Sequence, residues 1–434
     1  MTAPRASRRG LRVALALGTV AALAALAAAA VTWLNLRGEA PIPSDAPALA
    51  ASAQQIERGR YLALAGNCAG CHTAPGGADY AGGVGLPTPF GTVYAGNLTP
   101  DERTGIGAWN AAHFWRAMHH GRSRDGRLLY PAFPYTSFTQ ITREDSDALY
   151  AWLRTLPPVQ QANRAHSLRF PYSTQAALAV WRALYFRPAA FEPQPGQDAE
   201  WNRGAYLVGG LGHCMACHGA RNALGATDTG RSLGGGLLTG LGWYAPALDD
   251  SREAGVMRWS EADVVALLQT GLNRHASVSG PMAEVVYRST QHLKAEDLQA
   301  MARYLRAIPD RQAATPAPPA APPGAPPSAQ MLRGERIYAQ QCAWCHGEQG
   351  QGQPGAFPPL AGNRAVALAP PTNLVRMVRQ GGYLPATAGN PRPHGMPPFG
   401  HVLEDADIAA VLTYVRGSWG NNGSALGLQD VARR

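Results

Sequence analysis

The chain lacks any cysteine outside one repeated pattern. It has six cysteines among 434 residues, and all of them lie in three copies of C-x-x-C-H. With no cysteine left over, a dithiol redox pair or a zinc site is a poor interpretation. The chain also lacks a Gly-rich dinucleotide fingerprint and any substrate-site constellation of its own. No Lys/Arg run with interleaved aromatics occurs, so the net charge of +9 favours a partner-docking face over nucleic-acid binding.

Long hydrophobic runs are absent beyond the N-terminus, where one apolar stretch occurs. The stretch from Val13 to Leu34 carries no charge and is long enough to span a bilayer. Four basic residues precede it: Arg5, Arg8, Arg9 and Arg12. A basic flank before an apolar core is the export pattern, and the basic side stays in the cytoplasm. We predict that residues 1–36 are either a signal peptide, with cleavage sites near Ala28 to Ala30, or an uncleaved anchor, and that the remainder is exported.

The three C-x-x-C-H copies are the attachment signature of c-type haem. Two thiols on one helical turn each add to a vinyl group of the porphyrin, and the next residue supplies its imidazole as proximal iron ligand. The copies are Cys68-Ala69-Gly70-Cys71-His72, Cys214-Met215-Ala216-Cys217-His218 and Cys342-Ala343-Trp344-Cys345-His346. The sequence therefore predicts three covalent haems, with His72, His218 and His346 as iron ligands.

The sequences around the motifs resemble one another, which indicates a tandem array. A short predicted helix precedes each motif, with the sequences Arg58-Gly59-Arg60-Tyr61-Leu62, Arg203-Gly204-Ala205-Tyr206-Leu207 and Arg333-Gly334-Glu335-Arg336-Ile337-Tyr338. A second predicted helix ends each repeat, with the aligned triplets Trp152-Leu153-Arg154, Tyr304-Leu305-Arg306 and Tyr414-Val415-Arg416. Apolar residues in the closing helices recur at helical spacing, and Thr142 with Asp145 offers a cap for the first. We expect two helices crossing beside each haem.

Composition places the domain boundaries. The 49 Gly and 36 Pro residues favour compact domains with long irregular loops. A Pro/Ala-rich spacer precedes the third copy, so the third domain is expected to be freer. An amphipathic piece, Thr174 to Tyr185, is expected to pack the first two domains together. The predicted segments are 1–36, signal peptide or anchor; 53–165, 201–312 and 331–420, haem domains; 166–200, a connection; 313–330, the linker; and 421–434, a tail.

Second axial ligands are expected in loops between each haem motif and its closing helix. An electron-transfer haem often has a Met thioether there, which raises its potential. Met282 in Gly280-Pro281-Met282-Ala283 fits the second repeat, and Met396 in His394-Gly395-Met396-Pro397-Pro398 fits the third. A methionine can also be a core filler, but a Gly/Pro loop is a poor core position. We therefore predict Met282 and Met396 as iron ligands.

The first repeat departs from this pattern. Phe133 lies in its corresponding loop, Tyr130-Pro131-Ala132-Phe133-Pro134-Tyr135, and phenylalanine cannot ligate iron. The nearby alternatives are His113, Met118, His119 and His120. The first haem is therefore either five-coordinate or takes one of these side chains.

An alignment of the repeats bears on these alternatives. It matches Gly121 with Gly271 and Gly381, and Met118 with Leu268 and Val378. Because Leu268 and Val378 mark an apolar helix position, the aligned Met118 is expected in the core. His119 and His120 align with polar residues and are expected on the solvated side.

With these motifs the chain resembles the triple-haem cytochrome c subunit of bacterial membrane-bound dehydrogenases. The most specific stretches are Asn97-Leu98-Thr99-Pro100-Asp101 through Gly105-Ile106-Gly107, Arg203-Gly204-Ala205-Tyr206-Leu207, Gly280-Pro281-Met282-Ala283-Glu284-Val285-Val286 and Met396-Pro397-Pro398-Phe399. The resemblance runs from about Ala53 to Gly420. It implies a mainly α fold, with three tandem class I-like cytochrome c domains after an N-terminal export or anchor helix. The family includes partners of alcohol, gluconate, sorbitol and fructose dehydrogenases, and related cytochromes accompany molybdenum hydroxylases.

The resemblance implies an electron-transfer subunit and not the catalytic subunit. A flavoprotein, quinoprotein or molybdenum partner would oxidise an alcohol, sugar or aldehyde. The cytochrome would pass electrons to ubiquinone or another cytochrome at the periplasmic side of the inner membrane. The alcohol-dehydrogenase type carries Met where this chain has Phe133, which favours the molybdenum-hydroxylase branch. Two other functions remain: a stand-alone multihaem electron carrier, and a peroxidase-like enzyme with an open first haem.

Overall fold

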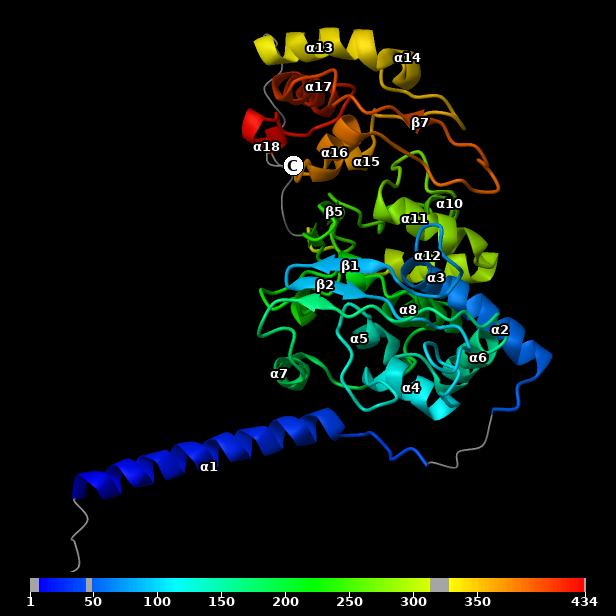
Figure 1. Cartoon of the computed structure of the whole chain (residues 1–434). Coiled ribbons are helices and arrows are strands. Elements are labelled where there is room, and N and C mark those ends of the chain that lie inside the picture. The colour runs from blue at the N-terminus through cyan, green and yellow to red at the C-terminus, as the bar shows by residue number, and fades with distance from the viewer. Residues whose placement is uncertain (1–7, 44–48, 313–327, 433–434) are drawn as a thin grey trace, which may run out of the picture.

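The computed structural model describes residues 8–43, 49–312 and 328–432. The described chain is mainly helical, as predicted, with short antiparallel strands between the helices. We refer to residues 53–165, 201–312 and 331–420 as the first, second and third repeats. Figure 1 shows the third repeat at one end of the molecule and a long helix, α1 (Arg8–Leu36), projecting from the other end, beside the first repeat.

Each repeat is built on a pair of crossing helices, as predicted. The pairs are α2 (Ala53–Ala65) with α6 (Arg143–Leu153), α8 (Ala199–Ala205) with α12 (Ala295–Arg306), and α13 (Ala329–Gln341) with α17 (Asp405–Gly417). A glycine lies at each crossing: Gly59, Gly204 and Gly334. A Cβ atom there would lie within 2.1 Å of a carbonyl oxygen on the partner helix. The glycine of each Arg-Gly pair therefore lets the two helices approach closely.

Short helices carry the haem motifs, and a further helix follows in each repeat. The motif helices are α3 (Cys68–His72), α9 (Met215–His218) and α14 (Ala343–His346), with a π-helical turn, η1 (Tyr206–Leu211), before α9. The later helices are α4 (Ala111–His120), α10 (Glu261–Thr270) and α16 (Thr372–Gln380). They end at Gly121, Gly271 and Gly381, whose φ angles of 57°, 76° and 71° are in the left-handed region that favours glycine. These shared ends support the alignment of the three repeats.

The other elements are short. They are the helices α5 (Tyr135–Phe138), α11 (Pro281–Arg288), α15 (Arg364–Ala367) and α18 (Leu428–Ala432), and the 3-10 turns η2 (Thr229–Arg231) and η3 (Thr290–His292). The strands are β1 (Gly85–Thr88), β2 (Gly91–Tyr94), β3 (Ser167–Leu168), β4 (Gly236–Leu238), β5 (Trp243–Ala245), β6 (Gly382–Tyr383) and β7 (Gly395–Met396). Strand β2 pairs with β1 and β3, β4 pairs with β5, and β6 pairs with β7, all antiparallel.

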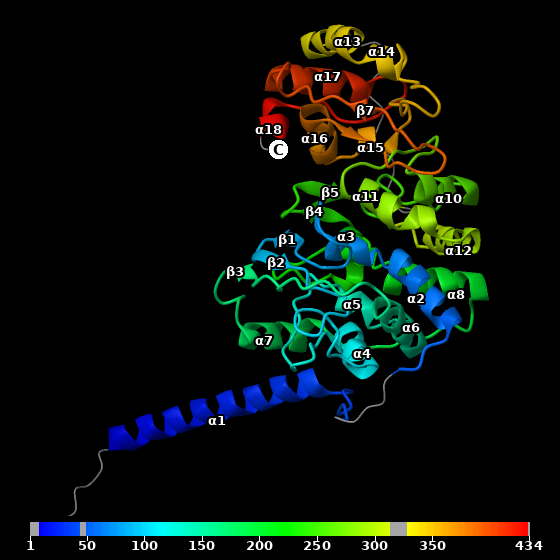
Figure 2. The same cartoon turned by 45° about the vertical axis from the view of Figure 1, so that its right-hand side comes forward.

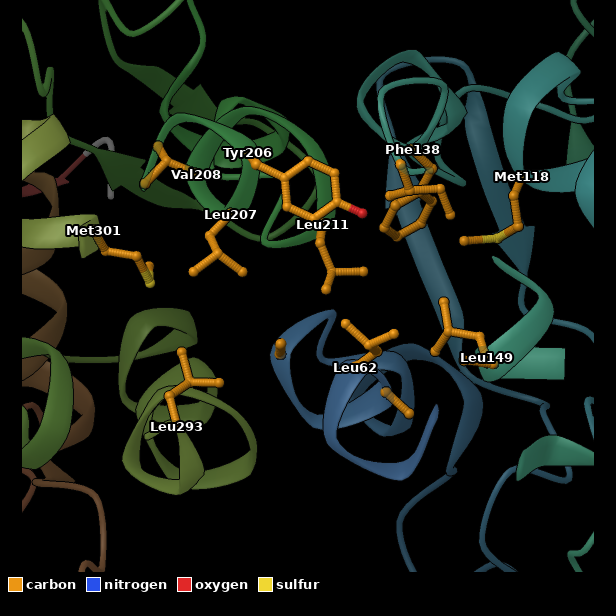
Figure 3. Packing of buried hydrophobic residues seen from close by; sticks show 14 of the residues in the cluster. Leu62, Met118, Phe138, Leu149, Tyr206, Leu207, Val208, Leu211, Leu293 and Met301 are labelled. Atoms are coloured by element: carbon orange, nitrogen blue, oxygen red, sulfur yellow. The ribbon is translucent and has the colours of Figure 1, made fainter. Parts of the chain in front are cut away.

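The first two repeats share one hydrophobic core, whereas the third has its own. Figure 3 shows Leu62 of the first repeat next to Leu211 of the second, within one cluster of buried side chains. The core of the third repeat includes Ile408, and Leu426 and Val431 also pack into it. Residues predicted to form a C-terminal tail are therefore part of the packing of the third repeat.

The third repeat packs against the second, which differs from the freedom expected for it. Asn373 of α16 forms two hydrogen bonds with Tyr244 of β5, accepting from its backbone N–H (2.8 Å) and donating to its carbonyl (2.7 Å). The Arg364 guanidinium donates to the carbonyl of Gly255 (2.6 Å) and lies over the ring of Trp259. The predicted linker, 313–330, lies outside the described residues as far as residue 327, and α13 begins at Ala329.

The predicted amphipathic piece forms a helix, α7 (Gln175–Tyr185), which the side chain of Thr174 caps. The indole of Trp181 in α7 donates to the carbonyl of Leu224 (2.9 Å), so α7 contacts the second repeat as predicted. It also packs against α1, a contact that the sequence did not predict. Within the described residues, α1 is the single helix long and apolar enough to cross a membrane, by length and composition, over Gly10–Leu36.

Candidate haem sites

Each motif histidine is fixed by a hydrogen bond between its ring and a backbone carbonyl. The Nδ1 atoms of His72, His218 and His346 lie 2.7, 2.7 and 3.0 Å from the carbonyl oxygens of Gly96, Pro246 and Pro358. When Nδ1 donates to a carbonyl, Nε2 keeps the lone pair that a metal needs. Burial lowers the pKa of all three imidazoles, which keeps them neutral. In all three rings, the hydrogen bond at Nδ1 and the neutral imidazole leave Nε2 available to bind a metal.

Several of the cysteine thiols lie in buried environments that suppress ionisation. Burial raises the pKa of Cys68 and Cys214 to about 12 and that of Cys342 to about 11. Such thiols stay protonated at neutral pH, unlike the activated thiolate of a redox dithiol. Across residues 8–43, 49–312 and 328–432, no group of three or more His, Cys, Asp or Glu side chains is placed to hold a metal ion. The raised pKa values of these thiols argue against a redox dithiol.

Met282 and Met396 lie on regular elements and not in the loops expected for them. Met282 is in the first turn of α11, whose first residue is Pro281, and its side chain packs against the shared core. Proline is favoured at the first position of a helix, so Pro281 starts a helix here. Met396 is in β7, opposite Gly382, and packs against the core of the third repeat.

In the first repeat, Phe133 packs its ring against the core. Its ring centroid lies 5.4 Å from that of Phe138. Met118 is 5% exposed in α4, at the position that Leu268 and Val378 occupy in the other repeats. Figure 3 shows Met118 beside Phe138 within the core. Met118 therefore lies in the core, as the alignment predicts.

His119 and His120 are buried, so the prediction that they lie on the solvated side is wrong. They are 9% and 7% exposed. The His119 ring stacks on Trp115, with centroids 4.4 Å apart, and Arg182 of α7 donates to the backbone carbonyl of His120 (2.7 Å). The repeat alignment missed the burial of His120 because α7, which contacts it, belongs to the connection after the first repeat and has no counterpart in the other two.

An Arg–Asp pair joins the two crossing helices in every repeat. The pairs are Arg58–Asp145, Arg203–Asp297 and Arg333–Asp407, with Nε–Oδ1 distances of 2.7, 2.7 and 2.8 Å. Each arginine is the first residue of the Arg-Gly pair that precedes a haem motif. The Arg-Gly repeat thus combines an ion pair with a close helix crossing.

Reciprocal tyrosines join the first two repeats, in what we call the tyrosine clasp. Tyr206 of the second repeat donates to Asp145 of the first, and Tyr61 of the first donates to Asp297 of the second, both at 2.6 Å. Although burial acts to raise it, the bonds from Arg203 and Tyr61 lower the pKa of Asp297. The shared Arg-Gly-x-Tyr spacing could have revealed this clasp. The third repeat has Arg336 in place of the tyrosine.

The first two haem motifs are neighbours. A ring nitrogen of His213, which precedes the second motif, lies 3.1 Å from the carbonyl oxygen of Gly66, which precedes the first. Burial and then the nearby Cys217 raise the pKa of Cys71. Helix α11, which carries Met282, contacts the motif helix α3. The region predicted to supply the second ligand of one site therefore adjoins the predicted attachment helix of the other.

Several buried polar side-chain atoms among the described residues lack partners, and two of the donors among them are of a kind that can bind a carboxylate. Trp259 is 4% exposed, and its Nε1 has no hydrogen-bond partner; the same holds for the buried Nε of Arg376. Buried donors are normally satisfied, and haem propionates supply acceptors of this kind. The free thiols of the motifs and the imidazoles held by their Nδ1 hydrogen bonds also fit a covalent haem.

The chain matches known proteins along most of its length. Residues 56–157 match the cytochrome c family, and residues 329–415 match the family described as cytochrome C oxidase, cbb3-type, subunit III. The alcohol dehydrogenase (quinone) cytochrome c subunit of Gluconacetobacter polyoxogenes is 39% identical over 384 residues, 84% of this chain and 81% of that one. The gluconate 2-dehydrogenase cytochrome c subunit of Pantoea cypripedii is 38% identical over 390 residues, 87% and 88%. A nicotinate dehydrogenase subunit of Pseudomonas putida is 43% identical over 373 residues, 84% of this chain but 30% of its own length.

These matches agree with the hydrogen-bonded motif histidines and the buried thiols. They place the protein among the c-type cytochromes. Two of the relatives, the alcohol and gluconate dehydrogenase subunits, match over four fifths or more of both lengths. They identify a narrower family within the c-type cytochromes. The chain belongs to the family of cytochrome c subunits of membrane-bound dehydrogenases, as the sequence motifs predicted.

Proposed function

We propose that the chain carries electrons through three covalent c-type haems, one in each of three class I-like domains, 53–165, 201–312 and 331–420. It receives them from a dehydrogenase catalytic subunit and passes them to ubiquinone or another respiratory acceptor, at the periplasmic side of the inner membrane. The observation that carries the proposal is the Nδ1–carbonyl hydrogen bond repeated at His72, His218 and His346. A redox dithiol has no use for such a bond, whereas a haem ligand does.

Each haem, when bound, supplies one-electron redox chemistry. The thioether bonds come from the cysteine pairs Cys68 with Cys71, Cys214 with Cys217, and Cys342 with Cys345. The carbonyls of Gly96, Pro246 and Pro358 orient the proximal rings and raise their basicity. Met282 and Met396 would supply the second ligands of the second and third haems, and a thioether ligand would favour the reduced iron.

The first haem has no strong second ligand in this proposal. Phe133 takes the place of the methionine, and the nearby histidines are engaged elsewhere. His113 accepts a hydrogen bond at its ring from the backbone of Asn110 (3.4 Å) at the start of α4. His119 is stacked on Trp115, and His120 lies under α7.

The names of the relatives guide the choice of donor and acceptor. They include an alcohol dehydrogenase (quinone), a gluconate 2-dehydrogenase and a nicotinate dehydrogenase subunit. We therefore propose a quinoprotein, flavoprotein or molybdenum partner that oxidises an alcohol, sugar or aldehyde, with ubiquinone as acceptor. Phe133 favours the molybdenum branch. Helix α1 exports the chain and anchors it in the membrane.

The test combines the chain with the catalytic subunit of its dehydrogenase complex. Substrate should reduce the haems of the complex, and a soluble ubiquinone analogue should reoxidise them. The chain alone should stay oxidised in the same substrate, because a haem accepts electrons and not hydride. A Cys342→Ser/Cys345→Ser variant, which lacks one attachment site, provides the matched control and should lose one haem. Turnover of substrate by the isolated chain, or no haem reduction in the complex, would overturn the proposal.

A further inference from the structure

The C-terminal end of α1 is fixed to the rest of the molecule at Asn35. Its side chain donates to the carbonyl of Ala179 in α7 (2.9 Å) and accepts from Nε of Arg182 (2.9 Å). Arg182 is 3% exposed, so this contact is buried. Arg122 of the first repeat donates to the carbonyl of Asn35 (3.1 Å) and to the carboxylate of Glu39 (2.8 Å). Helix α7 therefore has a fixed place beside the last turn of α1, and Figure 2 shows the two helices together.

The length of α1 places this contact relative to a bilayer. Arg12 is the last charged residue before the apolar run. About 20 residues, each rising about 1.5 Å, cross a hydrocarbon core of about 30 Å. Counted from Arg12, the core ends near Trp33, which is 66% exposed and of a residue type that gathers at membrane interfaces. Since Asn35 follows at once, α7 lies at the bilayer surface when α1 spans the membrane.

Helix α7 presents an apolar stripe on the face opposite its buried side. Leu178 and Arg182, four residues apart, form the buried side. Val180 and Leu184 are also four residues apart and are 48% and 62% exposed. Phe170, in the turn before α7, is 83% exposed. A soluble surface rarely gathers apolar side chains in this way without a partner.

We propose that α7 is an interfacial helix whose apolar stripe, Val180 and Leu184 with Phe170, lies in the outer boundary of the phospholipid bilayer. The proposal rests on the membrane anchoring that is part of the proposed function. The charge of Arg187, exposed just after α7, fits this occupant, because a cation beside an interfacial helix can pair with lipid phosphates. The stripe also belongs to the helix that contacts the last turn of α1, where the apolar run of α1 ends.

This placement has a consequence for electron transfer. Helix α7 belongs to the connection between the first and second repeats, and it contacts both. An interfacial α7 therefore holds these two repeats at the membrane surface. A lipid-soluble quinone arrives from that side.

The test uses introduced cysteines in the full-length haem-loaded chain in phospholipid nanodiscs. All six native cysteines lie in attachment motifs, so a single added thiol is the only reactive one once the haems are attached. The test positions are Leu184→Cys and, as a second variant, Val180→Cys. The control is Val402→Cys in the third repeat, which is 55% exposed in the structure. Val20→Cys, within the apolar run of α1, reports on the anchor. A charged, water-soluble maleimide measures the reaction rate at each position, and the haem spectrum verifies each variant's fold.

We expect Leu184→Cys and Val180→Cys to react at least tenfold more slowly than Val402→Cys. Equal rates at these positions, with Val20→Cys protected, would overturn the interfacial helix and leave the anchor intact. Rapid reaction at Val20→Cys would instead overturn the anchoring in the proposed function.

Discussion

At the scale of single residues, the two methionines are the sharpest test of the haem sites. Met282 and Met396 pack beside the cores of their repeats. We predict that their thioethers complete the iron coordination. Met282→Leu or Met396→Leu should lower the potential of one haem and remove its share of the sulfur-to-iron absorption near the red end of the ferric spectrum. Redox titration with optical detection measures both effects.

The control for these variants is Met301→Leu, which changes a buried methionine of α12 that no ligand role involves. It should leave all three potentials unchanged. Potentials and spectra that stay the same in Met282→Leu and Met396→Leu would show that neither thioether binds iron.

Phe133 predicts a first haem that differs from the other two. With no strong second ligand, its ferric iron should be high-spin in electron paramagnetic resonance and should bind cyanide readily. Phe133→Met should convert it to the low-spin spectrum of its neighbours. Phe138→Met, which changes an adjacent ring in the same core, should not. An entirely low-spin spectrum of the native protein would favour a histidine ligand.

His120 predicts an acid sensitivity of the first repeat. Burial, and then the neighbouring His119 and arginines, lowers its pKa from 6.5 to about 4. The folded protein therefore resists protonation of His120. The contribution of the neutral imidazole to the free energy of unfolding is complete above about pH 6.5 and declines as the pH falls toward 4. In thermal unfolding measured across that window, His120→Gln should lose less stability than the native chain. His401→Gln, at an exposed position, should follow the native curve.

Residue positions differed in how well the sequence predicted them. The cysteines and proximal histidines were clear, because the covalent chemistry fixes their spacing. Their carbonyl partners were not, since these lie 24, 28 and 12 residues away on loops of different length. His120 contacts α7, which only one repeat has.

At the scale of elements, the tyrosine clasp predicts how firmly the first two repeats are joined. Removing a hydroxyl that donates to a buried carboxylate should cost about 1.5–3 kcal/mol. Tyr206→Phe should therefore lower the unfolding temperature and free energy, because Asp145 is 1% exposed and loses a donor. Calorimetry measures the loss. Tyr383→Phe, 71% exposed, is the control, and equal behaviour of the two variants would contradict the role of the clasp.

The crossing helices were predictable from the sequence because their apolar spacing and Arg-Gly pairs recur in each repeat. The helix around Met282 was not, because Pro281 was interpreted as a loop residue. Proline breaks a helix in its interior but is favoured at its first position. The same residue therefore indicates a loop or a helix start, and only the surrounding packing decides between them.

At the scale of the whole molecule, the repeated sites predict three haems in one chain. Intact mass of protein exported with the haem-attachment machinery should show the addition of three haems, and the pyridine haemochrome should give the same number. The Cys342→Ser/Cys345→Ser variant should show two. A native stoichiometry of two or fewer would contradict the assignment of one of the motifs.

The mutual position of the repeats was the least predictable feature. The Pro/Ala-rich sequence before the third repeat favoured independence, yet Asn373 and Tyr244 dock that repeat onto the second. Composition describes the stiffness of a spacer but not the complementarity of the surfaces that it connects. Those surfaces involve residues scattered along both repeats.

The tyrosine clasp makes the first two repeats an internal counterpart of an isologous dimer. Equivalent positions, Tyr61 and Tyr206, each meet the carboxylate of the opposite repeat, as they would across a two-fold axis. Such an interface is closed, because each partner's contact surface is fully used by the other. A third copy cannot join by the same contacts. The third repeat, with Arg336 in place of the tyrosine, accordingly attaches through α16 to β5, a heterologous contact.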